Sequence, residues 1–388
     1  MEKPLGVYVH IPFCSSKCAY CNFNSLAGRD ELMPGYQAAV LRHIGQYPTL
    51  PGGRRADSVY FGGGTPGYYG ADPLIRILDA LKSRVTVLSG AEVTVEANPG
   101  SVTKADLEKL RRAGFNRISL GVQCADDGIL KIIGRTHTFA DAAAAVGDAK
   151  HAGFENISVD IIYGLPSQSM GSWKETVSKI IGLGARHISC YGLKLEENTP
   201  LYRAVFSAGT PPPLPDDDAQ ADMYLYAVKA FERAGYAQYE ISNFARGGCR
   251  SRHNMRYWLR GEYIGFGAGA SSFLGGRRFS SVEDTEEYIA RVMSNEDVDV
   301  YSEELTDSEN ASEYLMLGLR TARGISEDEY LELRGSSGAE FSRVSRLLTG
   351  YMEKGWARLA DGRWSFTPEG FLLSNILIGE ILDARGRR

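Results

Sequence analysis

The chain has 388 residues, which is too long for one ordinary hydrophobic core, so we expect more than one domain. Its net charge of -5 leaves no basic surplus to neutralise phosphates, so we expect no nucleic acid partner. No apolar run approaches the roughly 20 residues that a membrane-spanning helix needs, and residues 1–10 lack the pattern of a secretory signal. Six cysteines, three of them clustered, do not suit a disulfide framework. These features predict a cytoplasmic protein without a transmembrane segment.

Strand and helix signals alternate through the first half of the chain. The predicted strands are Gly6–Ile11, Ser58–Phe61, Glu92–Ala97, Arg117–Val122, Ser158–Tyr163 and His187–Leu193. The predicted helices are Tyr36–Tyr47, Pro73–Lys82, Lys104–Ala113, Ala140–Ala152 and Ser172–Leu183. This alternation indicates a parallel sheet with right-handed crossovers. Six strand–helix units fall short of the eight of a closed barrel, so we predict an α/β fold with a partial (β/α)6 TIM-like barrel over residues 1–210.

The middle of the chain, residues 211–305, is expected to form a linker helix and a small sheet that extends the barrel. Thr210–Pro215 is too rich in proline for a helix or a central strand. A helix capped at Asp216–Asp218 follows and runs to Ala234, and Tyr236–Phe244 is strand-like. The glycines of Gly261–Gly276 favour tight turns around that small sheet.

Residues 306–388 are predicted to form a smaller α+β domain that resembles a winged helix. Helical patterns occur at Ser308–Arg320, Glu327–Arg334 and Glu340–Lys354. Asp361-Gly362 then joins two short strand-like runs, as expected for a two-residue hairpin turn. Since the domain is not enriched in basic residues, a packing role is favoured over DNA binding.

Three cysteines, Cys14, Cys18 and Cys21, lie close together at spacings of four and three residues. Thiolates hold iron–sulfur clusters, and three ligands for four irons leave one iron free to bind a small molecule. The alternative is a zinc knuckle whose fourth ligand comes from elsewhere, for example from His10.

The surroundings of the cysteines favour the cluster. Their loop follows the first predicted strand, at the end where the chemistry of βα barrels takes place. The run Gly62–Pro66 follows the second strand, and its glycines allow the backbone to approach a ligand closely. Polar side chains also occur within or after later strands, where an apolar core would not choose them: Glu96, Gln123, Arg135 and Asp160. Structural ion pairs are the alternative for any one of these residues.

At this point the chain resembles the radical S-adenosylmethionine superfamily. The resemblance is to the branch that contains oxygen-independent coproporphyrinogen dehydrogenase and the HemW-type haem chaperones. It rests on the segments Tyr8–Cys14, Gly62–Pro66, Val95–Pro99, Gly121–Gln123, Gly134–Arg135, Asp160–Pro166, Glu240–Asn243, His253–Trp258 and Gly265–Ala270.

The resemblance implies a role for each matching position. Cys14, Cys18 and Cys21 look like the ligands of a 4Fe–4S cluster. The positions that look like S-adenosylmethionine contacts are Tyr8, Tyr20, Gly63, Gly64, Thr65, Glu96, Gln123, Arg135, Asp160 and Lys194. For Tyr20, facing the adenine and packing on the cluster are both open.

Two departures separate the chain from the dehydrogenase. That enzyme has a further cysteine two residues after the third ligand, where this chain has Phe23, and a long arm before the cluster loop, where only thirteen residues precede Cys14. Both features match the haem chaperones, as does His253–Trp258, which has the H-N-x-x-Y-W pattern of that group. His253 is therefore expected to contact haem, and the alternative is a hydrogen-bonded structural histidine. His10 is expected to support the cluster loop, and Cys124, Cys190 and Cys249 to be ordinary small residues.

The expected function is that of a haem chaperone, which binds haem and transfers it to an acceptor protein. One candidate acceptor is a membrane respiratory enzyme. Whether the chain is also an enzyme is left open. The alternatives are radical oxidative decarboxylation of coproporphyrinogen III and a radical enzyme that opens or methylates haem.

Overall fold

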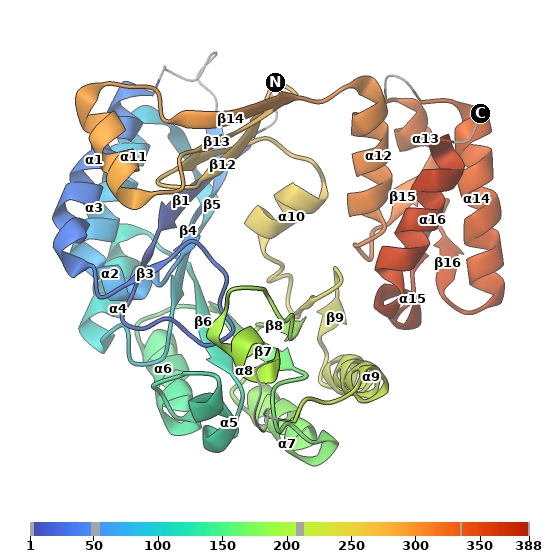
Figure 1. Ribbon diagram of the computed structural model, residues 1–388, viewed down its shortest axis with the longest axis horizontal. Helices are drawn as coiled ribbons and strands as arrows, with labels where there is room; N and C mark the ends of the chain where they lie inside the picture. Colours follow the sequence, from blue (N-terminus) through green and yellow to red (C-terminus); the bar gives the residue numbers. More distant parts are fainter. Residues whose placement is uncertain (1–3, 48–54, 207–212, 334–335, 387–388) are drawn as a thin grey trace.

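A twelve-stranded sheet runs through most of the chain in a computed structural model that describes residues 4–47, 55–206, 213–333 and 336–386. Its strands lie in the order β14-β13-β12-β11-β1-β4-β5-β6-β7-β8-β10-β9 (Figure 1). The six predicted strands are β1 (Leu5–Ile11), β4 (Arg55–Gly63), β5 (Thr86–Ala97), β6 (Arg117–Gln123), β7 (Asn156–Tyr163) and β8 (His187–Gly192). They pair in parallel in that order, so the predicted α/β fold with an open row of six parallel strands is confirmed.

Most of the connecting helices cover the outer face of this sheet, whereas α8 (Pro200–Phe206) lies at the ends of the strands and bonds the cysteine loop through Leu201 N (Figure 1). They are α1 (Met33–Gln46), preceded by the 3-10 turn Asp30–Leu32, α2 (Pro66–Tyr69), α3 (Ala71–Arg84), α4 (Lys104–Ala113), α5 (Asp127–Ile132), α6 (Phe139–His151), α7 (Met170–Gly182) and α8 (Pro200–Phe206). Helix α4 has the predicted bounds because Thr103 and Asp106 form a capping box and Gly114 ends it in the left-handed conformation. The short helices α2, α5 and α8 were not predicted, since one or two turns carry little periodicity.

The two faces of the parallel strands differ in polarity. On β6, for example, Ile118 and Leu120 are buried in the core, whereas Arg117 and Ser119 alternate with them. On β4, β5, β7 and β8, the positions that face the same way as Arg117 and Ser119 carry mostly polar residues. They include Ser58, Glu92, Thr94, Glu96, Ser158, Asp160, His187 and Ser189. The concave interior is therefore polar along the strands, and the polar residues seen in the sequence belong to one continuous surface.

The middle of the chain extends the same sheet at both edges. Strands β10 (Asn243–Ala245) and β9 (Ala237–Gln238) continue from β8, and α9 (Asp217–Arg233) packs beside α7. At the other edge lie β11 (Tyr263–Phe266), β12 (Ser271–Leu274), β13 (Arg277–Ser281), α11 (Thr285–Ser294) and β14 (Asp299–Glu304). The glycine-rich stretch thus supplies β11, which pairs in parallel with β1, in addition to the expected turns. Residues 210–212 of the predicted connector lie outside the described residues.

The C-terminal part has the predicted winged-helix-like arrangement. It contains α12 (Asp307–Gly318), β15 (Ile325–Ser326), α13 (Glu327–Leu331), α14 (Gly338–Glu353), β16 (Ala357–Ala360), β17 (Arg363–Phe366), α15 (Pro368–Leu372) and α16 (Ser374–Gly386). Its three strands form a separate antiparallel sheet. It is joined to the barrel sheet by backbone hydrogen bonds from Ile241 N to Arg320 O (2.9 Å) and from Ala322 N to Tyr239 O (3.0 Å). The boundaries proposed for the three domains remain predictions.

The glycine run lies against the segment that leads into the cysteine loop. Gly64 N donates to Ile11 O and Thr65 N to Phe13 O, both at 2.8 Å. Gly63 has φ +114°, and a Cβ there would stand 2.4 Å from the ring of His10. The glycines therefore make room for the neighbouring chain, and their expected role in the approach of a ligand remains a prediction.

Helix α10 (Arg252–Trp258) lies at the opposite end of the strands from the cysteine loop. Its Arg256 donates to Pro4 O (2.8 Å) and pairs with Asp57. His253 is 1% exposed, and its ring nitrogens lie 3.1 Å from the Ser58 hydroxyl and 2.8 Å from the Tyr257 hydroxyl. Burial, aided by Arg256 and Arg117, lowers the pKa of His253 to about 3. The geometry supports the structural histidine that the sequence left as the alternative.

Gly63→Ala is expected to destabilise the fold by about 2 kcal/mol, because the methyl group meets the His10 ring at a backbone angle that only glycine adopts readily. Urea unfolding measures the change. The matched control is Gly90→Ala, where a Cβ has no neighbour within 4 Å and the loss should stay below about 0.5 kcal/mol. Equal stabilities of the two variants would contradict the close contact.

His253→Gln is expected to weaken the pH dependence of stability. Between pH 6.5 and 3 the unfolded wild type binds a proton at this ring that the native protein does not, so its stability falls as the pH falls. From pH 6.5 to 5.5 the wild type should lose about 1 kcal/mol more than the variant, measured by urea unfolding at each pH. Parallel pH profiles would show that His253 is not a buried neutral group.

Candidate functional site

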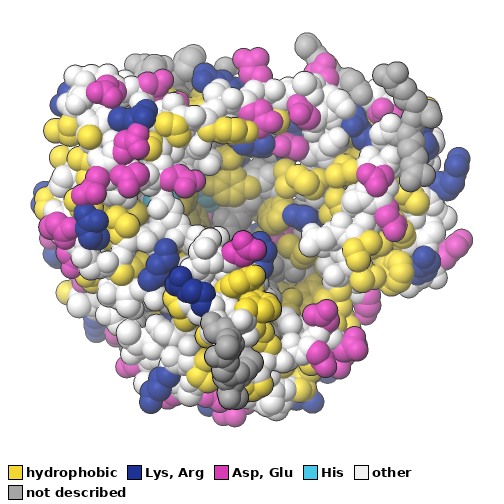
Figure 2. Space-filling model, in the orientation of Figure 1, with side chains coloured by type: hydrophobic (Ala, Val, Ile, Leu, Met, Phe, Trp, Pro, Cys, Tyr) yellow, Lys and Arg dark blue, Asp and Glu magenta, His cyan; other side chains and the backbone are white. Residues whose placement is uncertain are grey.

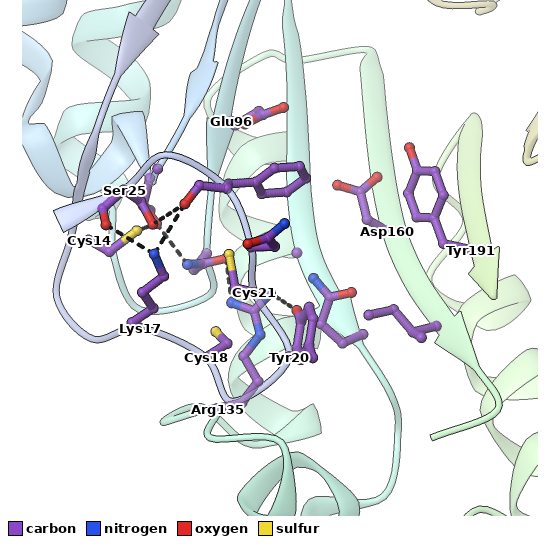
Figure 3. A pocket seen from close by; sticks show the side chains of 18 of the residues that line it. Cys14, Lys17, Cys18, Tyr20, Cys21, Ser25, Glu96, Arg135, Asp160 and Tyr191 are labelled. Atoms are coloured by element: carbon purple, nitrogen blue, oxygen red, sulfur yellow. Dashed lines mark hydrogen bonds between the residues drawn. The ribbon is translucent and has the colours of Figure 1, made fainter. Parts of the chain in front are cut away.

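A cavity of about 430 Å³ opens at the carboxyl ends of the parallel strands. It collects twelve of the thirteen residues predicted for the cluster and S-adenosylmethionine, all except Tyr8. Figure 3 shows the three cysteines on one side of this space and Asp160 and Tyr191 on the other. Such a concave site at the ends of parallel strands is where barrels of this kind place their chemistry.

The cysteine loop is held from several sides. Its base is closed by pairing of β2 (Phe13–Cys14) with β3 (Leu26–Ala27). Further along, Ala19 N donates to Ile133 O (3.0 Å) and Ala19 O accepts from Leu201 N (2.8 Å). The three thiols are free and partly exposed. Burial raises the pKa of Cys14 and Cys18, so these two thiols hold their protons at neutral pH and would release them on binding metal.

His10 is not placed as a fourth ligand of a zinc ion. Among the residues that the structure describes, no three His, Cys, Asp or Glu side chains gather closely enough to hold one metal ion. His10, the suggested fourth zinc ligand, is engaged instead with Asn24 O (2.8 Å) and the Tyr8 hydroxyl (3.1 Å).

A chain of hydrogen bonds joins the cysteine loop to the ends of β4 and β5 and to the segment after α5. Cys14 Sγ lies 3.3 Å from the Thr65 hydroxyl, which accepts from Asn98 Nδ2 at 3.0 Å. Asn98 Oδ1 accepts from Arg135 (2.7 Å), and Arg135 also donates to the Tyr20 hydroxyl (3.1 Å). Because the Thr65 hydroxyl accepts from Asn98, its own proton is available to the Cys14 sulfur.

Arg135 is the cationic member of this chain of hydrogen bonds, and it has donor capacity left over. Its Nε is buried without a hydrogen-bond partner, and its other bonds go to neutral groups. The sequence left open whether Arg135 pairs with a carboxylate of the strands or holds a carboxylate bidentately, and the side-chain bonds that the structure describes for it go to Asn98 and Tyr20. A buried guanidinium with an unused donor suits an anionic ligand in the cavity.

Two carboxyl groups, Glu96 and Asp160, also line the cavity. Glu96 accepts from the Tyr60 hydroxyl (2.6 Å) and from Gly63 N (3.3 Å). Burial, with a contribution from nearby Asp160, raises the pKa of Glu96 to about 7. Asp160 accepts from the Ser119 hydroxyl (3.0 Å), and burial raises its pKa as well. Their hydrogen bonds come from neutral groups, so a cation in the cavity would be stabilised.

The remaining predicted residues occupy different places. Gln123 lines the cavity with φ 65°, at a register shift that turns the end of β6 inward. Lys194 lies at the rim, 80% exposed and 2.6 Å from Glu196. Tyr8 does not line the cavity; its ring stacks with those of Tyr60 and His253. His253 likewise does not line it.

Several lining residues were not singled out from the sequence: Lys17, Ser25, Asn98, Ser119 and Tyr191. Asn98 lies in the matched segment Val95–Pro99, so its position next to Glu96 could have identified it. For Ser119, the inward-facing alternation with Ile118 and Leu120 was a usable signal. Lys17 had no signal beyond its place between two cysteines.

The residues present fit the two groups expected here. Three thiols form one wall, with the Arg135 guanidinium beside them. Two buried carboxyl groups and an unpartnered guanidinium nitrogen match the charges of an amino acid head group. Among the described residues, no helix is long and apolar enough to cross a membrane.

Comparison with known proteins finds relatives of one kind by family profile and by sequence. The profile described as the radical SAM superfamily matches residues 8–180, and that of the HemN C-terminal domain matches residues 305–373. A protein of Bacillus subtilis named heme chaperone HemW is 33% identical, over 97% of this chain and 99% of its own length. HemW of Escherichia coli is 37% identical over 69% of each chain.

Two further comparisons extend the picture. Radical S-adenosyl methionine domain-containing protein 1 of Bos taurus, a mitochondrial protein, is 34% identical over 84% of this chain and 75% of its own length. The solved structure of coproporphyrinogen III oxidase (HemN) from Escherichia coli superposes with a TM-score of 0.83 at 23% identity, covering 98% and 90% of the two chains. At that identity the likeness is one of fold. On these matches the chain belongs to the radical SAM superfamily and, within it, to the family of the HemW proteins.

Proposed function

We propose that this protein is a haem chaperone that binds haem and passes it to an acceptor protein. The observation that carries the proposal is the match to heme chaperone HemW of Bacillus subtilis, which extends over 97% of this chain and 99% of that protein. The acceptor is a haem-dependent protein, and a membrane respiratory enzyme is the candidate that we put forward.

Membership of the radical SAM superfamily implies a 4Fe–4S cluster and S-adenosylmethionine. We propose Cys14, Cys18 and Cys21 as the cluster ligands, because they share one wall of the cavity. Such a cluster leaves one iron free for the amine and carboxylate of S-adenosylmethionine.

The other cavity residues bind and orient S-adenosylmethionine in this proposal. Arg135 offers its unused Nε–H to an anionic group, and Glu96 and Asp160 offer carboxyl oxygens to cationic or hydroxyl groups. Tyr20, Gly63, Gly64, Thr65 and Gln123 line the same space, and Lys194 lies at its rim. Tyr8 contributes indirectly, since its hydroxyl lies 3.1 Å from His10, whose ring packs under Gly63.

The enzymatic alternative, decarboxylation of coproporphyrinogen III, receives no separate support. The likeness to the HemN structure is one of fold, and chaperone and enzyme share that fold. Phe23, which stands where the dehydrogenase has its further cysteine, lines the cavity and is 70% exposed. An apolar ring there can pack against a flat ligand but cannot donate a proton or bind metal.

Contact between His253 and haem iron would require the imidazole to give up one of its two hydrogen bonds. A haem titration of the His253→Gln variant decides this point. An unchanged Soret band and affinity would make His253 structural, whereas a shifted band would make it a ligand.

Cys18→Ala is expected to abolish the brown absorbance of the anaerobically reconstituted protein, because three thiolates are the source of cluster affinity in this cavity. Iron analysis and visible absorbance measure the loss. Cys249→Ala is the matched control, since that cysteine does not line the cavity, and it should load as the wild type does. A Cys18→Ala variant that still binds about four irons per chain would refute the ligand assignment.

The wild-type holoprotein is expected to take up haem with a new Soret band and to leave coproporphyrinogen III unchanged. Two parallel anaerobic incubations test this, one with haem and one with coproporphyrinogen III, S-adenosylmethionine and a reductant, with the products separated by chromatography. Haem uptake without turnover supports the chaperone. Repeated turnover to protoporphyrinogen that disappears in Cys18→Ala would replace the chaperone with the enzyme.

A further inference from the structure

Lys17 connects the two limbs of the cysteine loop. It lies between Cys14 and Cys18 and lines the cavity. Its ammonium donates to Phe23 O (3.2 Å) and to Ser25 O (3.3 Å), on the limb that leaves the cluster site (Figure 3). One side chain therefore joins positions six and eight residues further along the chain.

The other restraints on this loop act elsewhere. The pairing of β2 with β3 closes its base, and the bonds of Ala19 to Ile133 and Leu201 hold its tip. Between base and tip, Lys17 supplies the hydrogen bonds that the structure describes from the outgoing limb, residues 15–17, to the returning limb, residues 22–25.

The ammonium group also contributes charge beside the thiols. An ammonium has three N–H donors, and two of them are used on loop carbonyls. Arg135 lies near Cys18 on the other side of the thiols (Figure 3). Lys17 and Arg135 are thus two cations that line the cavity together with the three cysteines.

We propose that Lys17 is a positioning residue that keeps the cysteine loop closed in the form that accepts the cluster, and that its charge makes the cluster easier to reduce. This inference rests on the proposed cluster site. A reduced cluster carries one more negative charge, which a fixed neighbouring cation stabilises, so removing the cation lowers the midpoint potential.

The experiment compares wild type, Lys17→Met, Lys17→Arg and Lys131→Met. Lys131 is an exposed lysine on α5 that does not line the cavity, so its replacement changes the net charge equally without touching the loop. Three quantities are measured: the alkylation rate of the cysteines in the iron-free protein, the rate of iron loss from the reconstituted protein to a chelator, and the midpoint potential by dye-mediated titration.

In Lys17→Met, the rates of cysteine alkylation and of iron loss should each be about fivefold higher than in the wild type, because the hydrogen bonds from Lys17 to Phe23 O and Ser25 O are lost. Its midpoint potential should move to a more negative value. Lys17→Arg and Lys131→Met should behave like the wild type in all three measurements.

The inference would be overturned if Lys17→Met had the alkylation rate, rate of iron loss and midpoint potential of the wild type. It would also be overturned if Lys131→Met changed these three quantities as much as Lys17→Met does. If the wild type itself takes up no cluster, the proposed function fails. The alkylation rates of the iron-free proteins then still decide whether Lys17 closes the loop.

Discussion

The site depends on how tightly the end of β4 lies against the chain leaving β1. Two backbone hydrogen bonds of 2.8 Å join Gly64 and Thr65 to Ile11 and Phe13, and this approach leaves no room for a side chain at Gly64. The contact fixes where the cysteine loop starts and brings the Thr65 hydroxyl to Cys14. The positions of the cysteines in the cavity therefore depend on this contact between the end of β4 and the chain leaving β1.

The polar interior is the second constraint. Buried charges are costly unless they are paired or hydrogen-bonded. Here Arg117, with two unpartnered nitrogens, shares the interior with carboxyl groups such as Glu92 and Asp160. Despite its burial, these neighbours raise the pKa of Arg117, so it stays charged. The fold tolerates this interior because its stability comes from the apolar layer between strands and outer helices.

His253 and Cys18 illustrate two uses of sequence motifs. Both lie in segments that resemble the family, and both were assigned to a cofactor or ligand. The cysteine lies on the cavity wall with its partners, whereas the histidine is enclosed at the other end of the strands with both nitrogens in hydrogen bonds. A motif identifies a residue that matters to the molecule, but its surroundings decide whether it can meet a ligand.

The sequence by itself determined the six parallel strands and the bounds of α4, because periodicity and capping are local properties. Most of the residues proposed for the cavity came from the resemblance to the radical SAM superfamily, and that resemblance did not point to Lys17, Ser25, Ser119 or Tyr191. Only the tertiary structure decided that β11 pairs with β1, that Lys17 ties the loop and that Tyr8 and His253 turn away from the cavity. These outcomes depend on contacts between segments as far apart as Ser58 and His253. Local sequence patterns do not predict such contacts, because the two residues become neighbours only when the whole sheet has formed.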